Sequence, residues 1–224
     1  MCLRIVNAGL RLPYRILLKC LAVLPYFRFE QESRNTQTPA TIEHWLIQNV
    51  LGINRGPYWP VHYTSRVSGW ENILAGVETC PGYMGGCYIQ GIGKIRIGDY
   101  TQIASNVGII SANHSLTDNR KHSLDEVCIG EYCWLGMNSV ILPGVTLGDF
   151  TVVGAGAIVT KSYPEGHCVI GGNPAKVIRT LNPDECVRHV SEYEYHGYIP
   201  RTRFEDFCQR HLNFPSTTTS AENR

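Results

Sequence analysis

The amino-acid sequence predicts an all-β solenoid, and three observations support that fold class. Aliphatic residues recur at every sixth position over long stretches, glycine follows many of them, and compact residues stand four positions after them. A period of six fits neither a helix nor a simple alternating strand, but it fits a short strand and a tight turn repeated around a prism. An ordinary β-sandwich would show turns at less regular intervals of about 8 to 12 residues.

The clearest block of this repeat runs from Ile129 to Val159. Its register is aliphatic throughout: Ile129, Leu135, Ile141, Leu147, Val153 and Val159. The compact residues four positions on are Cys133, Ser139, Val145, Thr151 and Ala157. Each aliphatic side chain is expected to stack on its counterpart one coil away, and burying one contributes about 1.5 to 3 kcal/mol. The block therefore predicts a continuous core.

A weaker block precedes it and is expected to keep one register from Val61 to Ile109. Its nine positions are Val61, Val67, Ile73, Thr79, Gly85, Gly91, Ile97, Ile103 and Ile109. Between Ile109 and Ile129 lie 20 residues where six are expected, so 14 residues are extruded as a loop at about 115–128. Loops that project from a rigid solenoid commonly carry binding and chemistry, and His114 stands at the root of this one.

Helices are expected on both sides of the repeat. Thr38 and Pro39 suit the N-cap and first turn of a helix at about 39–51. Helical patterns also begin at Asn182 and near 202–211, and the residues from Pro215 have the composition of a disordered tail. The expected organisation is a helical extension (1–58), a repeat domain (59–180) and a helical segment with a tail (181–224).

Composition limits the function classes. Lys and Arg together number 20 against 19 for Asp and Glu. The chain therefore has almost no net charge, and no excess of positive charge favours nucleic acid as a partner. Nine cysteines include no C-x-x-C pair, which argues against a zinc cluster and a disulfide framework. We therefore expect a reducing, cytoplasmic location and no metal.

The N-terminal segment is apolar but interrupted by cations. Arg4, Arg11, Arg15 and Lys19 divide every long apolar run, so neither a membrane span nor a signal peptide is expected. On a helix these four cations form one stripe. Such a helix over residues 3–24 is expected either to pack on the core or a partner subunit, or to lie on the inner face of a membrane as a peripheral contact.

Two stretches resemble the hexapeptide-repeat acyltransferases of left-handed parallel β-helix fold, above all the bacterial sugar and polysaccharide O-acetyltransferases. They are IGEYCWLGMNSVILPGVTLGDFTVVGAGAIVTK, from Ile129 to Lys161, and GGNPAKVIR, from Gly171 to Arg179. The resemblance covers roughly residues 59–180. It implies left-handed coils, a homotrimer with active sites between subunits, and transfer of an acetyl group from acetyl-CoA to a hydroxyl of a sugar or surface polysaccharide.

The resemblance also implies roles for side chains near the loop. A histidine at the start of the loop is catalytic in this family, and His114 holds that position. A neutral imidazole, whose ordinary pKa is about 6.5, can take the proton of an attacking hydroxyl and so contribute about 10² to 10⁴ in rate. Asn113 and Asp118 are candidates for orienting its ring. Trp134 is implied beside the acceptor, where an indole stacks on a sugar ring, and His122 is either an acceptor contact or simply exposed.

Positions for coenzyme A follow from the same resemblance. The implied contacts of the pantetheine arm are Gly136, Met137, Ala155, Gly156, Thr160 and Lys161. Lys161, Lys176 and Arg179 would supply cations for its phosphates. Direct attack on the thioester needs a base and a donor for the oxyanion, for which a backbone N–H suffices. Cys133 occupies an inward position of the repeat, so a thiol nucleophile is not expected.

Three other functions remain open at the level of sequence. The acceptor can instead be an amino sugar, free or nucleotide-linked, which would make the protein an N-acetyltransferase. A β-helical metalloenzyme of the carbonic anhydrase kind needs three histidines, but none lies between His122 and His167. A non-catalytic scaffold is the third alternative, because solenoids also serve as recognition surfaces.

Overall fold

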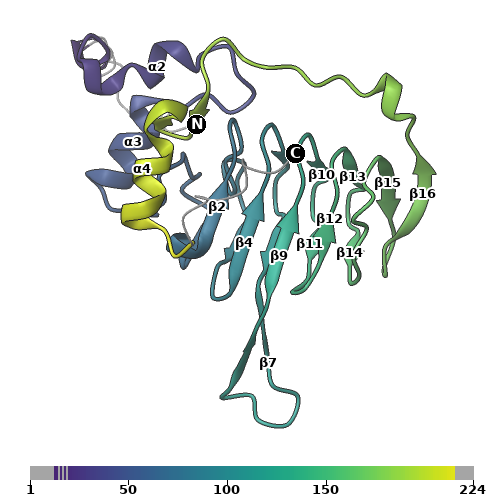
Figure 1. The fold of residues 1–224 in the computed structure, drawn as a ribbon. Coiled ribbons are helices and arrows are strands. Elements are labelled where there is room, and N and C mark those ends of the chain that lie inside the picture. Colours follow the sequence, from purple (N-terminus) through teal and green to yellow (C-terminus); the bar gives the residue numbers. More distant parts are fainter. Residues whose placement is uncertain (1–12, 15, 17, 19, 215–224) are drawn as a thin grey trace.

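The computed structural model describes residues 13, 14, 16, 18 and 20–214, and its body is a solenoid of three parallel sheets (Figure 1). Sheet A consists of β1 (Arg66–Ser68), β3 (Tyr88–Gln90), β6 (Gly108–Ile110), β11 (Val140–Ile141) and β14 (Ile158–Val159). Sheet B consists of β2 (Ile73–Ala75), β4 (Lys94–Ile97), β9 (Glu126–Ile129) and β12 (Thr146–Leu147). Sheet C consists of β5 (Gln102–Ile103), β10 (Trp134–Leu135), β13 (Thr151–Val153), β15 (Cys168–Gly171) and the antiparallel β16 (Lys176–Thr180).

The six-residue repeat builds the core as predicted for the second block. Ile129 pairs in register with Leu147, and Leu135 pairs with Val153, so one coil consists of three hexads. All six aliphatic positions of the block are no more than 4% exposed. The five compact positions, from Cys133 to Ala157, are likewise buried. Both inward positions of each hexad therefore fill the interior.

The first block does not keep the single register that we expected. Val67 pairs with Ile89, and Ile73 pairs with Ile95, so this coil is longer than three hexads by four positions. The fully buried side chains are accordingly those of Ile89 and Ile95, and the expected position Gly85 stands outside the strands. The cause is a longer turn segment after β2, in which Gly82 and Gly86 adopt positive φ angles of 88° and 80°.

The extruded loop is a β-hairpin that projects far from the body (Figure 1). Its strands are β7 (Ala112–His114) and β8 (His122–Leu124), which pair antiparallel between β6 of sheet A and β9 of sheet B. The hairpin begins and ends a few residues earlier than the expected range 115–128. It ends earlier because Glu126–Ile129 is already β9, which pairs with β4. Ile97 pairs with Ile129, whereas a step of three hexads from Ile97 would reach only Ser115. The chain between Ile109 and Ile129 thus leaves the coil as a hairpin instead of continuing the repeat.

Short helices cover the end of the solenoid where the chain enters it (Figure 1). They are η2 (Pro25–Phe27), α2 (Phe29–Glu32), α3 (Ile42–Asn49) and α4 (Arg201–His211), and η3 (Trp70–Asn72) lies next to β2. The expected helices at 39–51 and 202–211 correspond to α3 and α4. The cap of α3 is Thr41, whose hydroxyl accepts the N–H of His44, and not Thr38, whose hydroxyl donates to the carbonyl of Glu78. The basic stripe in residues 3–24 falls mainly outside the described residues.

Residues 181–194 form an extended strap, which returns along the solenoid to the small hairpin of β17 (Tyr195–His196) and β18 (Ile199–Pro200) (Figure 1). The helical pattern expected from Asn182 is wrong beyond η4 (Pro183–Glu185). Its apolar positions Val187 and Val190 are exposed. The strap is held by polar side chains that contact the turns of the coils, and a helical pattern does not encode such contacts. In the described part of the chain, no helix has the length and apolar character needed to cross a membrane.

Candidate active site

His114 lies on the projecting hairpin with its orientation fixed by a backbone carbonyl. Its Nδ1 is 2.6 Å from the carbonyl oxygen of Asn119, and its ring centroid is 4.4 Å from that of His122, the residue opposite it in the hairpin. A carbonyl accepts but cannot donate, so in the neutral ring Nδ1 carries the hydrogen. Nε2 then keeps its lone pair and can accept a proton from a bound molecule.

Asp118, one of the two residues expected to orient His114, is bonded to cations of its own loop. The Asp118 carboxylate accepts from Arg120 Nε at 2.8 Å and lies 3.8 Å from Lys121 Nζ. Hydrogen bonds from Arg120 therefore hold the pKa of Asp118 below its ordinary value. Among the described residues, neither Asn113 nor Asp118 donates to or accepts from His114. A backbone carbonyl such as that of Asn119 leaves no mark in the residue pattern, which is why sequence reasoning missed it.

Trp134 stands on a different face of the chain from His114. It belongs to β10 of sheet C, where it pairs with Gln102 and Val152, and its side chain points outward with 57% of its surface exposed. The hairpin that carries His114 leaves the solenoid between sheets A and B. One chain alone therefore does not bring the implied base and the implied acceptor contact together.

Four of the implied coenzyme A positions share one corner of the solenoid. Gly136 and Met137 follow β10, and Ala155 and Gly156 follow β13, so all four lie between sheets C and A on adjacent coils. The Gly156 N–H donates to the Met137 carbonyl at 2.8 Å, which ties the two turns together. Gly156 has a φ of 71° and open space where a Cβ would lie, whereas a Cβ at Gly136 would meet the Val153 carbonyl at 2.5 Å. Met137, Ala155 and Gly156 form an open surface there.

The four remaining positions are exposed on the last coils. Thr160 and Lys161 follow β14, and the Lys161 ammonium lies 5.6 Å from the centroid of the Tyr163 ring. Lys176 and Arg179 lie on β16. Arg179 pairs with Val169, Val169 pairs with Val152 on the next strand, and Val152 pairs with Trp134. Arg179 and Trp134 thus lie in one outward row of sheet C.

A column of stacked aromatic rings follows the corner between sheets B and C, and sequence reasoning missed it. The rings of Tyr100, Tyr132 and Phe150 succeed one another at centroid distances of 5.1 and 5.0 Å. Each ring follows glycine and an acid, in Gly-Asp-Tyr (98–100), Gly-Glu-Tyr (130–132) and Gly-Asp-Phe (148–150). That recurrence is visible in the sequence, and it predicts a row of acidic side chains beside the column of rings.

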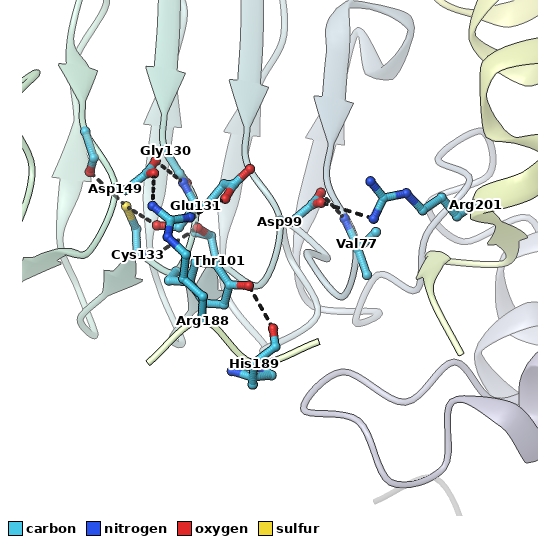
Figure 2. A network of polar contacts seen from close by, with 12 residues as sticks. Val77, Asp99, Thr101, Gly130, Glu131, Cys133, Asp149, Arg188, His189 and Arg201 are labelled. Carbon is cyan, nitrogen blue, oxygen red and sulfur yellow. Dashed lines mark hydrogen bonds and ion pairs between the residues drawn. The ribbon is translucent and has the colours of Figure 1, made fainter. Parts of the chain in front are cut away.

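The strap binds to this column through Arg188 (Figure 2). Its guanidinium donates to Glu131 at 2.6 Å and to Asp149 at 2.5 Å, and it lies over the Tyr132 and Phe150 rings. Partial burial alone would raise the pKa of Asp149, but the hydrogen bonds from Arg188 and from the Glu131 N–H outweigh it and lower that pKa. Asp149 is therefore ionised near neutral pH, and together with Glu131 it holds the strap through Arg188.

Two hollows lie beside these elements. One, of about 360 Å³, lies between sheet C and the strap and includes Trp134, Gln102 and His189 in its lining; we call it the Trp134 hollow. The other, of about 540 Å³, lies between α2 and α4. Among the described residues, no group of three or more metal-ligating side chains is arranged to hold a metal ion.

Buried thiols offer no alternative nucleophile in the repeat. Burial raises the pKa of Cys133 to about 11 and that of Cys80 to about 12. A thiol with such a pKa is almost entirely protonated near neutral pH, and the thiolate is the reactive form. Cys133 therefore belongs to the core, as its inward position predicts.

Known proteins share both the repeat and the fold. Residues 129–161 match the sequence model of the bacterial transferase hexapeptide (six repeats). The galactoside O-acetyltransferase of Escherichia coli (strain K12) is 38% identical over 109 residues, which are 47% of this chain and 53% of that protein. The chloramphenicol acetyltransferase of Agrobacterium fabrum is 38% identical over 73 residues, 33% of this chain and 34% of that protein. The chain thus spans about half the length of the first relative and a third of the second.

A solved structure extends the likeness over most of the chain. The galactoside acetyltransferase in complex with coenzyme A has 26% identity and a TM-score of 0.54, and the match covers 86% of this chain and 92% of that one. The paired hexads from Ile129 to Val159 occupy the same stretch as the matched repeat. The chain therefore carries the bacterial transferase hexapeptide repeat at residues 129–161 and is similar in sequence and fold to galactoside acetyltransferases.

Proposed function

We propose that this protein transfers an acetyl group from acetyl-CoA to a hydroxyl of a sugar or surface polysaccharide, with His114 as general base. The observation that carries the proposal is the hydrogen bond between His114 Nδ1 and the Asn119 carbonyl, because it leaves Nε2 free to accept a proton. The likeness to galactoside O-acetyltransferase and to a galactoside acetyltransferase in complex with coenzyme A supports the acceptor class and the acetyl donor.

Acetyl-CoA supplies the acyl group as an activated thioester. Nε2 of His114 accepts the proton of the acceptor hydroxyl as its oxygen attacks, and the resulting imidazolium returns that proton to the departing sulfur. The Asn119 carbonyl stabilises this imidazolium, because it accepts the Nδ1 hydrogen in both protonation states. A backbone N–H would stabilise the developing oxyanion.

The residues at the corner between sheets C and A fit a coenzyme A arm. Gly156 leaves open space, and Met137 and Ala155 form an exposed, largely apolar strip on adjacent coils. Lys161, Lys176 and Arg179 have no acidic partner within the described part of the chain, so their charges are available to phosphates. We assign the pantetheine contacts to Gly136, Met137, Ala155, Gly156, Thr160 and Lys161.

A complete site needs a second copy of the chain. His114 leaves the solenoid between sheets A and B, and Trp134 faces outward from sheet C, so a neighbouring copy must supply one of them. We therefore propose a homotrimer of left-handed coils with sites between subunits, since a closed ring of identical interfaces satisfies every copy. Asn113 and His122 flank the base in the hairpin.

The test is acetyl transfer by the full chain and by His114→Ala to a panel of neutral sugars, amino sugars and polysaccharide fragments, followed by mass spectrometry. We expect an O-acetyl product and a loss of at least about 100-fold in kcat for His114→Ala. His211→Ala, at another exposed histidine, is the matched control and should retain its rate. A loss well below 100-fold would remove the base from the mechanism, and N-acetyl product alone would reassign the acceptor.

A further inference from the structure

We infer that the hollow between α2 and α4 binds an amphiphile in which a phosphate group is joined to a hydrocarbon chain; we call it the helix-cap hollow. Its lining comes from η2, α2, the hairpin of β17 and β18, and α4, and includes no residue of the coils or of the projecting hairpin. The helices among these elements cover the end of the solenoid where the chain enters it (Figure 1). A volume of about 540 Å³ is that of a small-molecule site. The inference is independent of the proposed acetyl transfer.

Three arginine side chains line the helix-cap hollow without an acidic partner. They are Arg28, at the start of α2, and Arg203 and Arg210, both on α4. Arg203 and Arg210 are seven positions apart, which is two turns, so they share one face of α4. Asp206 lies between them at helical spacing, yet within the described part of the chain it forms no ion pair with either. Guanidinium groups left free around one space suit the oxygens of a phosphate.

The acids of the hollow do not neutralise this positive charge. Glu32 accepts the hydroxyl hydrogen of Tyr195. Burial and the hydrogen bond to Glu32 raise the pKa of Tyr195, so its hydroxyl stays protonated and keeps Glu32 bonded. Asp206 is the other carboxylate in the lining, so three guanidinium groups face two carboxylates, one of which is already bonded. The complementary ligand group is therefore an anion.

Much of the remaining lining is aromatic or aliphatic. Phe29 is 2% exposed, and its ring centroid lies 5.0 Å from that of Tyr198. The Tyr198 hydroxyl donates to the side-chain oxygen of Gln48 at 2.7 Å, so the polar end of this ring is already bonded. Ile199 and Phe207 extend the same lining. A wall of this kind gains free energy by covering hydrocarbon.

The apolar surface continues outside the hollow, which favours a hydrocarbon chain over a compact polar ligand. Tyr26 lines the hollow and is 67% exposed. Val23 and Leu24, just before the lining residue Pro25, are 80% and 49% exposed. Neighbouring apolar side chains exposed at one place are typical of an interaction site. A chain whose phosphate is bound by the arginines can extend over these residues.

The experiment measures binding of ethyl, butyl and hexyl phosphate, inorganic phosphate and ADP to the full chain by calorimetry. We expect hexyl phosphate to bind at least about 10-fold more tightly than ethyl phosphate, because each added methylene buries more apolar area. The double variant Arg203→Gln/Arg210→Gln should bind hexyl phosphate at least about 10-fold more weakly. Asp206→Asn should bind it several-fold more tightly, because the substitution removes a carboxylate that repels the phosphate.

The matched control is the double variant Arg34→Gln/Arg55→Gln. It removes the same charge from two exposed arginines outside the hollow, so the affinity for hexyl phosphate should not change. Circular dichroism verifies that each variant is folded. Loss of binding in the first double variant but not in the control supports the inference.

The inference is overturned if hexyl phosphate does not bind, if ethyl or inorganic phosphate binds as tightly, or if both double variants lose the same affinity. Tighter binding of ADP than of hexyl phosphate also overturns it and assigns the hollow to a nucleotide. Binding to phosphatidic acid vesicles without binding of soluble alkyl phosphates overturns it too, because a membrane surface would then be recognised. Acetyl transfer enters none of these measurements, so their outcome does not depend on the test of His114→Ala.

Discussion

His114 and Asp118 stand close together on one hairpin, and the structure separates their roles. The ring of His114 is oriented by the Asn119 carbonyl, and the Asp118 carboxylate is bound to Arg120 and Lys121. Asp118→Ala should therefore leave kcat within a few-fold of wild type, because no bond to the base is lost. Steady-state kinetics check this, and a loss as large as that expected for His114→Ala would mean that the carboxylate orients the ring after all.

Cys133 tests the assignment of the buried thiols at the same scale. Its pKa of about 11 leaves roughly one molecule in a thousand as thiolate at pH 8, so a thiol reagent should modify it only slowly below pH 11. The exposed Cys20 serves as the internal control and should react at once. Site-resolved mass spectrometry over a pH series measures both, and rapid labelling of Cys133 at pH 8 in folded protein would contradict its place in the core.

The hairpin of β7 and β8 is an insertion in an otherwise regular element. Removing residues 112–125 joins Ser111 to Glu126 and restores a coil of three hexads between Ile97 and Ile129. We expect this variant to fold with a thermal midpoint near that of wild type and to lose acetyl transfer with His114. Circular dichroism and the acetyl-transfer assay measure the two outcomes.

The matched control for that deletion removes one residue fewer, 113–125. A shift of one residue turns every side chain of the following strand to the opposite face, so Ile129 would point outward. This variant should be markedly less stable than the deletion of 112–125. Equal stability of the two deletions would mean that the coil does not depend on its register.

The elements divide into those that the sequence pattern encodes and those that it does not. Each hexad from Ile129 to Val159 has an aliphatic residue at one position and a compact residue four positions later. Only one coil register buries both residues, so these coils could be predicted. Turns vary more freely, which is why the longer coil that starts at Val67 could not be predicted. The strap is held by single long-range contacts of Arg188 and Ser191, and such contacts have no period.

At the scale of the whole molecule, the distribution of His114 and Trp134 over two faces makes a prediction about assembly. Neither His114→Ala nor Trp134→Ala should be fully active alone, but their mixture should regain activity if each site uses residues of two copies. Random mixing in equal amounts should restore about a quarter of the wild-type sites in a closed ring. The measurement is acetyl-transfer rate after co-expression and purification of the mixed oligomer.

A mixture no more active than the two separate variants would show that both residues serve the same copy. Residue spacing predicts which coil a side chain belongs to but not which copy of the chain faces it, so the division of the site between copies enters the sequence analysis only as an implication of the resemblance. The resemblance implies a trimer, and the strand order places His114 and Trp134 on different faces of the chain.

β16, the antiparallel strand at the far end of sheet C, has a consequence beyond the site it borders. Parallel coils end in open strand edges, and an open edge invites the edge of another molecule to add to it, which leads to fibres and aggregates. β16 reverses direction over β15, breaks register between Val169 and Ile170, and exposes Lys176 and Arg179. A reversed, irregular and cationic edge is a poor template for a further parallel strand, so β16 disfavours strand addition at this end of sheet C.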